Sequence, residues 1–294
     1  MAVKNYIYAA LDFIFDKEKN LYFIEANSSP GALGEYKKLY HDIRPVIELC
    51  RLLNKRFKHL AVISKKRWKK TAVSREFRRY FKGKISFCNY ERNKSRMLKG
   101  DGSLISSKGN IVHPDVILRV AAGKAVAQEK AGIKVINPQC VSNLTLDKLK
   151  TKKIVKDHTD VKVPRYFRIN KKSDIKKNIS DIFTQGFVLK PLKGQKSQGL
   201  FIFHSYADIP KDFTIKRPYI LEQLIHSQDL FKDEFFEIRS MAVGGRYAGS
   251  MLFVSPKRPM HLFAEGRAVK IPRNLEIKVK KATEKIVKAI DAHC

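Results

Sequence analysis

Two short apolar segments joined by a polar turn begin this 294-residue chain, and they restrict its fold more than any other feature. Residues 6–15 are rich in aromatic and β-branched side chains, and residues 21–25 are again apolar. The five residues between them are polar or charged. This pattern predicts an antiparallel β-hairpin, with the break at residues 28–31, Ser-Ser-Pro-Gly, ending the second strand.

Polar side chains interrupt this hairpin at three positions. Asp12 lies on the first segment, and Glu25 and Asn27 lie two residues apart at the end of the second, so the latter two share one face. If Asp12 points to the same face, three oxygen ligands converge in a way that suits Mg²⁺. The alternative from spacing alone is a polar edge strand with solvated carboxylates.

Strand and helix patterns alternate in the segment that follows. Apolar residues recur at helical spacing over 42–56, and 59–64, 84–90 and 134–137 are apolar, strand-like runs separated by helical patterns. Such alternation predicts a small parallel α/β unit. Residues 100–110, rich in serine and glycine, are expected to form a loop.

The second half of the chain favours antiparallel strands and two helices. The clearest pair is 235–243 and 246–254, joined by Gly-Gly, which predicts a two-residue hairpin turn. One helix is predicted over 144–157, and another with a continuous apolar side over 275–292.

One lysine-containing segment suggests phosphate binding, and a second carries several lysines on a predicted helix. Lys190 ends an apolar run and is followed by Gly194–Gly199, a glycine-bounded loop whose backbone could cover phosphate oxygens. A simple hairpin turn is the alternative for this loop. Lys148, Lys150 and Lys152 lie on the helix predicted over 144–157, where a solvated face is the alternative.

Composition excludes some classes and leaves one question open. No stretch approaches the ~20 apolar residues of a membrane span, and the N-terminus does not resemble a signal peptide. The four cysteines lie far apart in sequence, which favours a reduced, cytoplasmic protein without zinc ribbons or disulfides. The formal charge of +32, from 60 basic and 28 acidic residues, fits nucleic acid, an acidic protein, anionic substrates or general lysine enrichment.

Taken together, these segments resemble the ATP-grasp superfamily, closest to its RimK-like and D-alanine–D-alanine ligase-like carboxylate–amine ligases. Asp12, Glu25 and Asn27 match the family's magnesium ligands, and the motif Glu237-Ile238-Arg239 matches a family hairpin. The resemblance implies two ATP lysines, a phosphate-covering loop and a hinge that receives adenine. These ATP-binding positions are Lys152, Lys190, Gly194, Ser197, Gly199, Glu222, Gln223, Leu224 and Ile225.

The order of the segments differs from that of the family. In ordinary members the magnesium strands come last, after a helix like 275–292, whereas here they come first. The resemblance therefore implies a circularly permuted ATP-grasp fold of the α/β class with α+β lobes. The alternatives are that the N-terminal hairpin serves a second chain, or that it belongs to a fragment of a longer tandem protein.

The expected domains follow from this order. Residues 1–57 form the magnesium-site part of the large lobe, and 58–143 form a parallel pre-ATP-grasp domain. Residues 144–217 form the small lobe with the phosphate loop, and 218–294 form the remainder of the large lobe.

The resemblance implies an ATP-dependent carboxylate–amine ligase that works through an acyl-phosphate and releases ADP and phosphate. Its cofactors are ATP and Mg²⁺, expected as two ions, with Mn²⁺ able to substitute. Ala10 and Ala264 depart from residues common in the family, so Arg239 or Arg267 is expected to stabilise the reacting charge. The alternatives are a degenerate ATP-binding scaffold or a nucleic-acid-binding protein on the same fold.

The resemblance also implies a set of partners. The substrates are a small-molecule or peptide carboxylate and an amine, with an acidic peptide or protein as one candidate. A homodimer is compatible with the resemblance, whereas a membrane partner is not expected.

Overall fold

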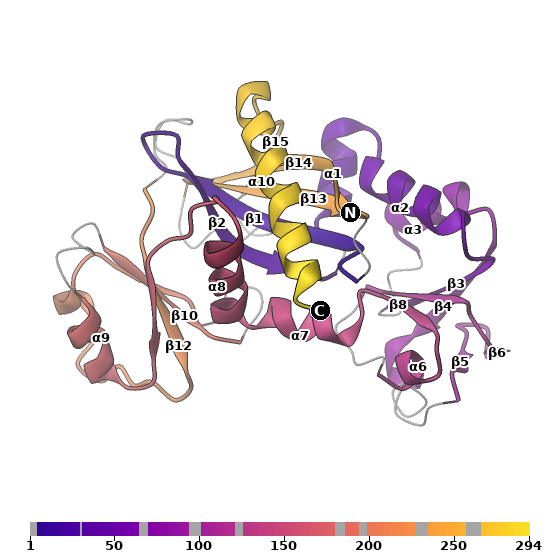
Figure 1. The fold of residues 1–294 in the computed structure, drawn as a ribbon, viewed down its shortest axis with the longest axis horizontal. Helices are drawn as coiled ribbons and strands as arrows, with labels where there is room; N and C mark the ends of the chain where they lie inside the picture. Colours follow the sequence, from indigo (N-terminus) through magenta and orange to yellow (C-terminus); the bar gives the residue numbers. More distant parts are fainter. Residues whose placement is uncertain are drawn as a thin grey trace.

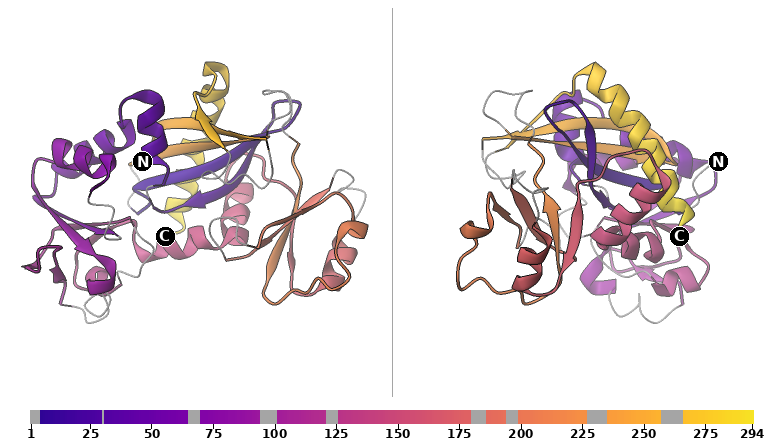
Figure 2. Two further views of the ribbon diagram at one scale, coloured as in Figure 1. Left: turned by 180° about the vertical axis from the view of Figure 1, so that it is seen from behind. Right: turned by 60° about the vertical axis from the view of Figure 1, so that its left-hand side comes forward.

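Three sheets of four or five strands carry the chain in the computed structural model (Figure 1). The structure describes residues 5–29, 31–64, 70–93, 101–120, 126–179, 186–193, 199–226, 235–256 and 266–294. The parallel sheet lies at one end of the molecule, the small antiparallel sheet at the other, and the five-stranded sheet between them (Figures 1 and 2). This arrangement matches the predicted α/β class with α+β lobes.

The five-stranded antiparallel sheet joins the two ends of the sequence. Its strand order is β15 (Arg267–Val269), β14 (Arg246–Ser255), β13 (Phe235–Val243), β1 (Tyr8–Phe15) and β2 (Leu21–Asn27). The predicted N-terminal hairpin is confirmed, and it pairs through β1 with the C-terminal strand β13 of its own chain. The hairpin therefore completes this chain's own sheet, in contrast to the alternative in which it serves a second chain.

The turn between β13 and β14 is also as predicted. Gly244 and Gly245 have φ angles of 58° and 80°, in the left-handed region that glycine adopts without strain. Two such residues form the type of turn whose twist matches that of the flanking strands.

Helix α10 (Arg273–Ala292) covers one face of the five-stranded sheet (Figure 2). Leu275, Val279, Ile286 and Ile290 are buried on it. They pack with side chains from β1, β2, β13 and β14 in one apolar cluster. The helix predicted over 275–292 is thus confirmed, starting two residues earlier, just after Pro272.

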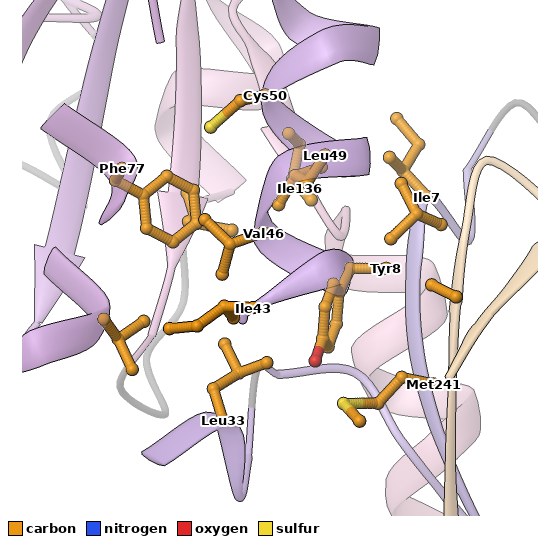
Figure 3. Packing of buried hydrophobic residues seen from close by; sticks show 14 of the residues in the cluster. Ile7, Tyr8, Leu33, Ile43, Val46, Leu49, Cys50, Phe77, Ile136 and Met241 are labelled. Carbon is orange, nitrogen blue, oxygen red and sulfur yellow. The ribbon is translucent and has the colours of Figure 1, made fainter. Parts of the chain in front are cut away.

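The opposite face of the sheet continues into the parallel domain. Tyr8 and Met241 pack in one cluster with Val46, Leu49 and Phe77 (Figure 3). Val46 and Leu49 belong to α2 (Arg44–Asn54), and Phe77 belongs to α3 (Ala72–Tyr80). This shared core fixes the parallel domain against the five-stranded sheet.

The parallel sheet has the order β4 (Lys84–Asn89), β3 (His59–Ser64), β7 (Val116–Arg119) and β8 (Lys134–Ile136). Its strands pair in parallel, which confirms the parallel α/β unit predicted from sequence. The segment expected as a loop instead contains a small hairpin, β5 (Leu104–Ile105) and β6 (Ile111–Val112).

The small antiparallel sheet has the order β11 (Phe201–Phe203), β10 (Phe187–Pro191), β12 (Tyr219–Gln223) and β9 (Tyr166–Ile169). The remaining short elements are α1 (Leu33–Tyr40), α4 (Tyr90–Asn93), α6 (Val126–Lys130), α9 (Lys172–Asn178) and the 3-10 turn Tyr206–Asp208. Residues 121–125, the start of a predicted helix, lie outside the described residues.

The single helix predicted over 144–157 is wrong. Two helices occupy this region, α7 (Gln139–Leu146) and α8 (Lys148–His158). Asp147 separates them because its backbone is extended and its side chain accepts a hydrogen bond from the backbone N–H of Lys150. An aspartate in this position caps the N-terminus of the next helix, so it starts α8 at Lys148.

The beginning of the chain lies against the end of α10. The backbone N–H groups of Asn5 and Tyr6 donate to Oδ1 of Asp291 at 2.6 and 2.7 Å.

All four cysteines are free thiols. Among the described residues, the search for a helix long and apolar enough to cross a membrane finds none.

Candidate active site

Three adjacent strands place charged side chains in one row. Asp12 on β1 lies directly opposite Arg239 on β13 and Glu25 on β2. Arg239 donates from Nε to Oδ1 of Asp12 and from Nη2 to Oδ2, both at 2.7 Å. Asn27 Nδ2 donates to Oδ2 of Asp12 at 3.2 Å. The side chains of Asp12 and Asn27 therefore meet on one face, as the hairpin pattern predicted.

Contacts from two directions hold the end of this hairpin. The hydroxyl of Tyr6 donates to the carbonyl oxygen of Asn27 at 2.8 Å. Asn137, after β8, accepts from the N–H of Tyr8 at 3.0 Å and donates to the carbonyl oxygens of Tyr8 and Ser28. Because Asn137 is fully buried, these three bonds fix the strand ends beside the row of charges.

Helix α8 brings two lysines to this row. Lys148 Nζ lies 3.2 Å from a carboxylate oxygen of Glu25, and its side chain is 12% exposed. Lys152, one turn later on the same side of the helix, is fully buried and lies 3.4 Å from the carbonyl oxygen of Phe23 on β2. The sequence motifs predicted an ATP-binding role for Lys152 and none for Lys148. The spacing of four residues, which puts both lysines on one side of a helix, was the signal for Lys148.

A buried carboxylate joins Lys152 to the small antiparallel sheet. Glu222 on β12 lies 3.3 Å from Lys152 and 2.6 Å from Lys190 on β10. The two lysines, 38 positions apart in sequence, therefore share one counter-charge. The structure thus brings Lys152, Lys190 and Glu222 together, and it turns the Glu222 side chain toward the lysines.

The pKa values reflect this crowding of charges. Burial favours the neutral form of Glu25, but Lys148, Lys190 and Arg239 outweigh it and lower the pKa of Glu25 to about 2. Burial, with the charge of Asp12, raises the pKa of Glu237 on β13 to about 8. Sequence analysis quoted Glu237 in a motif without a role. Its two-residue spacing from Arg239 was the signal that both share a face.

Burial affects the pKa values of the two buried lysines, Lys152 and Lys190, differently. It lowers the pKa of Lys152 to about 8, because the attraction of Glu222 only partly offsets the loss of water. For Lys190 the nearby charges of Glu222 and Glu25 outweigh burial and raise its pKa. The cluster as a whole holds four carboxyl groups, Asp12, Glu25, Glu222 and Glu237, and four cations, Lys148, Lys152, Lys190 and Arg239.

The donor set suits Mg²⁺ bound together with a nucleotide. Asp12, Glu25 and Asn27 offer carboxylate and amide oxygens, and Glu25 is ionised at neutral pH. Among the residues that the structure describes, no group of three histidine, cysteine, aspartate or glutamate side chains is placed to hold a metal. Metal binding here would therefore depend on the asparagine amide, phosphate oxygens and water, which is the usual situation for Mg²⁺.

The remaining predicted positions belong to other segments of the chain. Gly194 and Ser197 fall outside the described residues, and Gly199 has a φ of 75° next to Arg217 and Tyr219. Arg267 begins β15, which β14 separates from the strand of Arg239.

The predicted adenine hinge follows Glu222. Gln223 donates its N–H to the carbonyl oxygen of Arg165, and Leu224 donates to that of Gly186. Ile225 is buried next to them. These bonds fix the start of the segment that leads from the small sheet to the five-stranded sheet. The contacts of this segment with adenine stay a prediction.

Solved structures resemble this arrangement although sequences do not. No protein-family model matches the chain, and no curated protein is significantly similar to it. A structure from Methylobacillus flagellatus, provisionally assigned as a gamma-glutamylcysteine synthetase, covers 99% of this chain and 89% of its own, with a TM-score of 0.64 and 11% identity.

Two further structures share most of the chain. The ATP-grasp ligase PsnB, complexed with a minimal precursor, covers 79% of this chain and 82% of its own, with a TM-score of 0.51 and 16% identity. An N5-carboxyaminoimidazole synthetase from Staphylococcus aureus covers 79% of this chain and 63% of its own, with a TM-score of 0.50 and 12% identity. The chain has the ATP-grasp fold, as its motifs indicated.

Proposed function

We propose that this protein is an ATP-dependent ligase that joins a carboxylate to an amine. The observation that carries the proposal is the meeting of the Arg239–Asp12–Glu25 row with the lysines of α8 and β10. Oxygen ligands for a metal thus lie next to cations for phosphate, in a fold whose solved examples include ligases.

The proposed reaction has two steps. In the first step, a carboxylate oxygen of the substrate forms a bond to the γ-phosphorus of ATP while the bond to the β-bridging oxygen breaks, so that an acyl-phosphate and ADP result. In the second, the amine nitrogen attacks the acyl carbon, phosphate leaves, and the nitrogen loses a proton. Mg²⁺ held by Asp12, Glu25 and Asn27 would neutralise charge on the phosphates.

The cations have separate tasks in this proposal. Lys148, Lys152 and Lys190 would hold phosphate oxygens as point charges. Arg239 is fixed by its two bonds to Asp12, so it would face the transferring group without further reorganisation. Burial and the charge of Asp12 raise the pKa of Glu237 to about 8, so its ionised form, present at pH 8 and above, is a stronger base than an ordinary glutamate for the proton that the amine releases.

The test is the dependence of ATP cleavage on both substrates. ADP and phosphate should form only when an acid and an amine from a substrate panel are present together. Glu25→Ala should remove this turnover while circular dichroism shows that the variant still folds and melts cooperatively. Glu18→Ala, an exposed glutamate in the turn of the same hairpin, is the matched control and should retain turnover. ATP-independent amide formation, or full activity of Glu25→Ala, would contradict the proposal.

We also infer that the fold is circularly permuted, with the expected domains 1–57, 58–143, 144–217 and 218–294. The contacts of Asn5 and Tyr6 with Asp291 support this, since old termini must lie close together for a permutation.

Re-opening the chain tests this order. A chain that starts at residue 58, joins residue 294 to residue 1 through a short glycine–serine linker, and ends at residue 57 should fold with a similar Tm. A break inside β13 is the control and should prevent cooperative folding. A re-opened chain that fails to melt cooperatively would count against the permutation.

A further inference from the structure

The charge excess of the chain is concentrated in one stretch. Residues 44–84 contain 15 lysines and arginines and only two acidic residues, so 41 of the 294 residues carry +13 of the total +32. The stretch also holds seven of the 18 arginines of the chain. General lysine enrichment does not explain a local excess of arginine.

Two helices of this stretch, α2 and α3, pack together. Helices α2 and α3 bury their apolar residues, among them Leu49 and Phe77, in the core they share with the parallel sheet. The two helices lie next to each other beside that sheet, and α2 also contacts β13 and β14 of the five-stranded sheet (Figure 1). We define the basic face as the exposed cations of α2, of α3 and of the described segments next to these helices: Arg44, Arg51, Lys55, Arg56, Lys58, Lys70, Arg75, Arg78, Arg79, Lys82 and Lys84.

Residues 44–84 themselves supply little acidic charge to compensate the basic face. From outside this stretch, Asp42 accepts a hydrogen bond from the backbone N–H of Arg44, and Asp115 accepts from that of Lys58. Glu48 pairs with Arg51 at 2.7 Å. Glu76 pairs at 2.5 Å with Lys37 of α1, which is a cation outside the basic face. The two acidic residues of the stretch are therefore already engaged, and the face retains a large positive charge.

Two of its arginines lie over aromatic rings. The guanidinium of Arg78 lies 4.6 Å from the ring centre of Phe87, and that of Arg79 lies 5.4 Å from that of Tyr80. Stacking engages the flat side of a guanidinium, whereas carboxylates are bound by the N–H groups in its plane. Arginines oriented in this way lose less conformational entropy when they bind a carboxylate.

We propose that the basic face docks a carboxylate-rich peptide segment of the substrate, an inference that rests on the proposed ligase function. The charges of the active-site cluster largely compensate one another, so the cluster offers an acidic peptide no long-range attraction. The basic face supplies that attraction and raises the local concentration of substrate. Phe87 and Tyr80 are covered by arginines, so they do not form the open stacking platforms typical of single-stranded nucleic-acid sites.

Binding without ATP isolates this proposal from the chemistry. A fluorescein-labelled peptide of alternating glutamate and glycine should bind the wild-type protein in an anisotropy titration at about 50 mM salt. The variant Arg75→Gln/Arg78→Gln/Arg79→Gln should bind about tenfold more weakly, which is the combined effect of three exposed ion pairs. Thermal melts establish that each variant is folded.

A matched variant separates location from total charge. Lys280→Gln/Lys281→Gln/Lys288→Gln removes three exposed charges from α10 and should weaken binding less than twofold. Arg75→Lys/Arg78→Lys/Arg79→Lys keeps the charge and loses the planar donors, so its affinity should fall between the two. Equal losses in the α3 and α10 variants would overturn the proposal.

Two further outcomes distinguish the possible errors. Tighter binding of a 20-base-pair DNA or RNA duplex than of the peptide, at the same salt, would assign the face to nucleic acid and overturn the proposal. Glu25→Ala should bind the peptide as the wild-type protein does. Peptide binding that persists while no ligase activity is found would refute the proposed function and leave the docking surface standing.

Discussion

The candidate active-site cluster and the basic face both contain lysines and arginines, but these side chains are buried in the cluster and exposed on the basic face. In the cluster, each of the four cations lies within 3.3 Å of a carboxylate oxygen, and most of its atoms are out of water. On the basic face, eleven cations are exposed, and the stretch that carries them contains two acidic residues, of which Glu48 pairs with Arg51. Burial of charge requires compensation, whereas water and salt screen an exposed excess. This chain can therefore bury a charged side chain only where a side chain of opposite charge lies next to it.

The largest expected effect comes from breaking a compensated pair. Asp12→Ala leaves Arg239, whose side chain is 15% exposed, without its bidentate partner. The free energy of unfolding should fall by about 3 kcal/mol, because an unpaired charge remains out of water. Urea denaturation followed by circular dichroism measures this change.

Two controls accompany this variant. Asp160→Ala breaks the exposed pair with Lys285 and should leave stability unchanged. Asp12→Leu/Arg239→Met, which removes both charges, should recover part of the lost stability. Equal costs for Asp12→Ala and Asp160→Ala would show that the cluster is not the compensated environment described here.

A second expected effect depends on pH. Burial lowers the pKa of Lys152 to about 8 in the folded protein, while the unfolded chain keeps the usual 10.5. Between these values the unfolded chain binds more protons, so raising the pH favours folding. The stability of the wild-type protein relative to Lys152→Met should therefore rise by about 3 kcal/mol from pH 8 to 10.5.

Urea denaturation of the two proteins across this pH range is the measurement. Lys153→Met alters the next residue, which is exposed and paired with Asp157. Its difference from the wild-type protein should stay constant between pH 8 and 10. If the difference in unfolding free energy between Lys152→Met and the wild-type protein also stayed constant with pH, burial would not lower the pKa of Lys152.

The smallest expected effect belongs to the basic face. Neutralising Arg75, Arg78 and Arg79 to glutamine should raise Tm by about 1–2 °C at low salt, because it relieves repulsion among exposed cations. The gain should disappear near 1 M NaCl. Differential scanning calorimetry at several salt concentrations tests this, with Glu25→Ala as the reference whose salt dependence should match the wild-type protein. A gain that persists at high salt would point to packing instead of charge.

Local sequence patterns predicted a large part of the fold. The hairpin around Asp12 and Glu25 was predictable because alternating residues and a polar turn fix both strands and their shared face. Helix α10 was predictable because its apolar side is continuous over five turns. The break between α7 and α8 was missed, since Asp147 was interpreted as part of a helix when its side chain caps the next one.

The site was predictable only in part. Asp12, Glu25 and Asn27 converge through one hairpin, so short-range geometry was sufficient. The pairing of Lys148 with Glu25, and the place of Glu222 between Lys152 and Lys190, join elements more than 30 residues apart. No local pattern encodes such distances, and residue type alone does not show which lysine on a helix is buried.

By itself the sequence determined most of the strands, most of the helices, the shared face of the polar side chains on the hairpin and the excess of positive charge. These features depend on neighbours within a few residues or on composition. Only the tertiary structure decided that the first strands complete the sheet of the last ones, because pairing between β1 and β13 joins residues more than 220 positions apart. It alone also divided the cations into a buried, compensated cluster and an exposed face, since burial and partner charges arise only when the chain is packed.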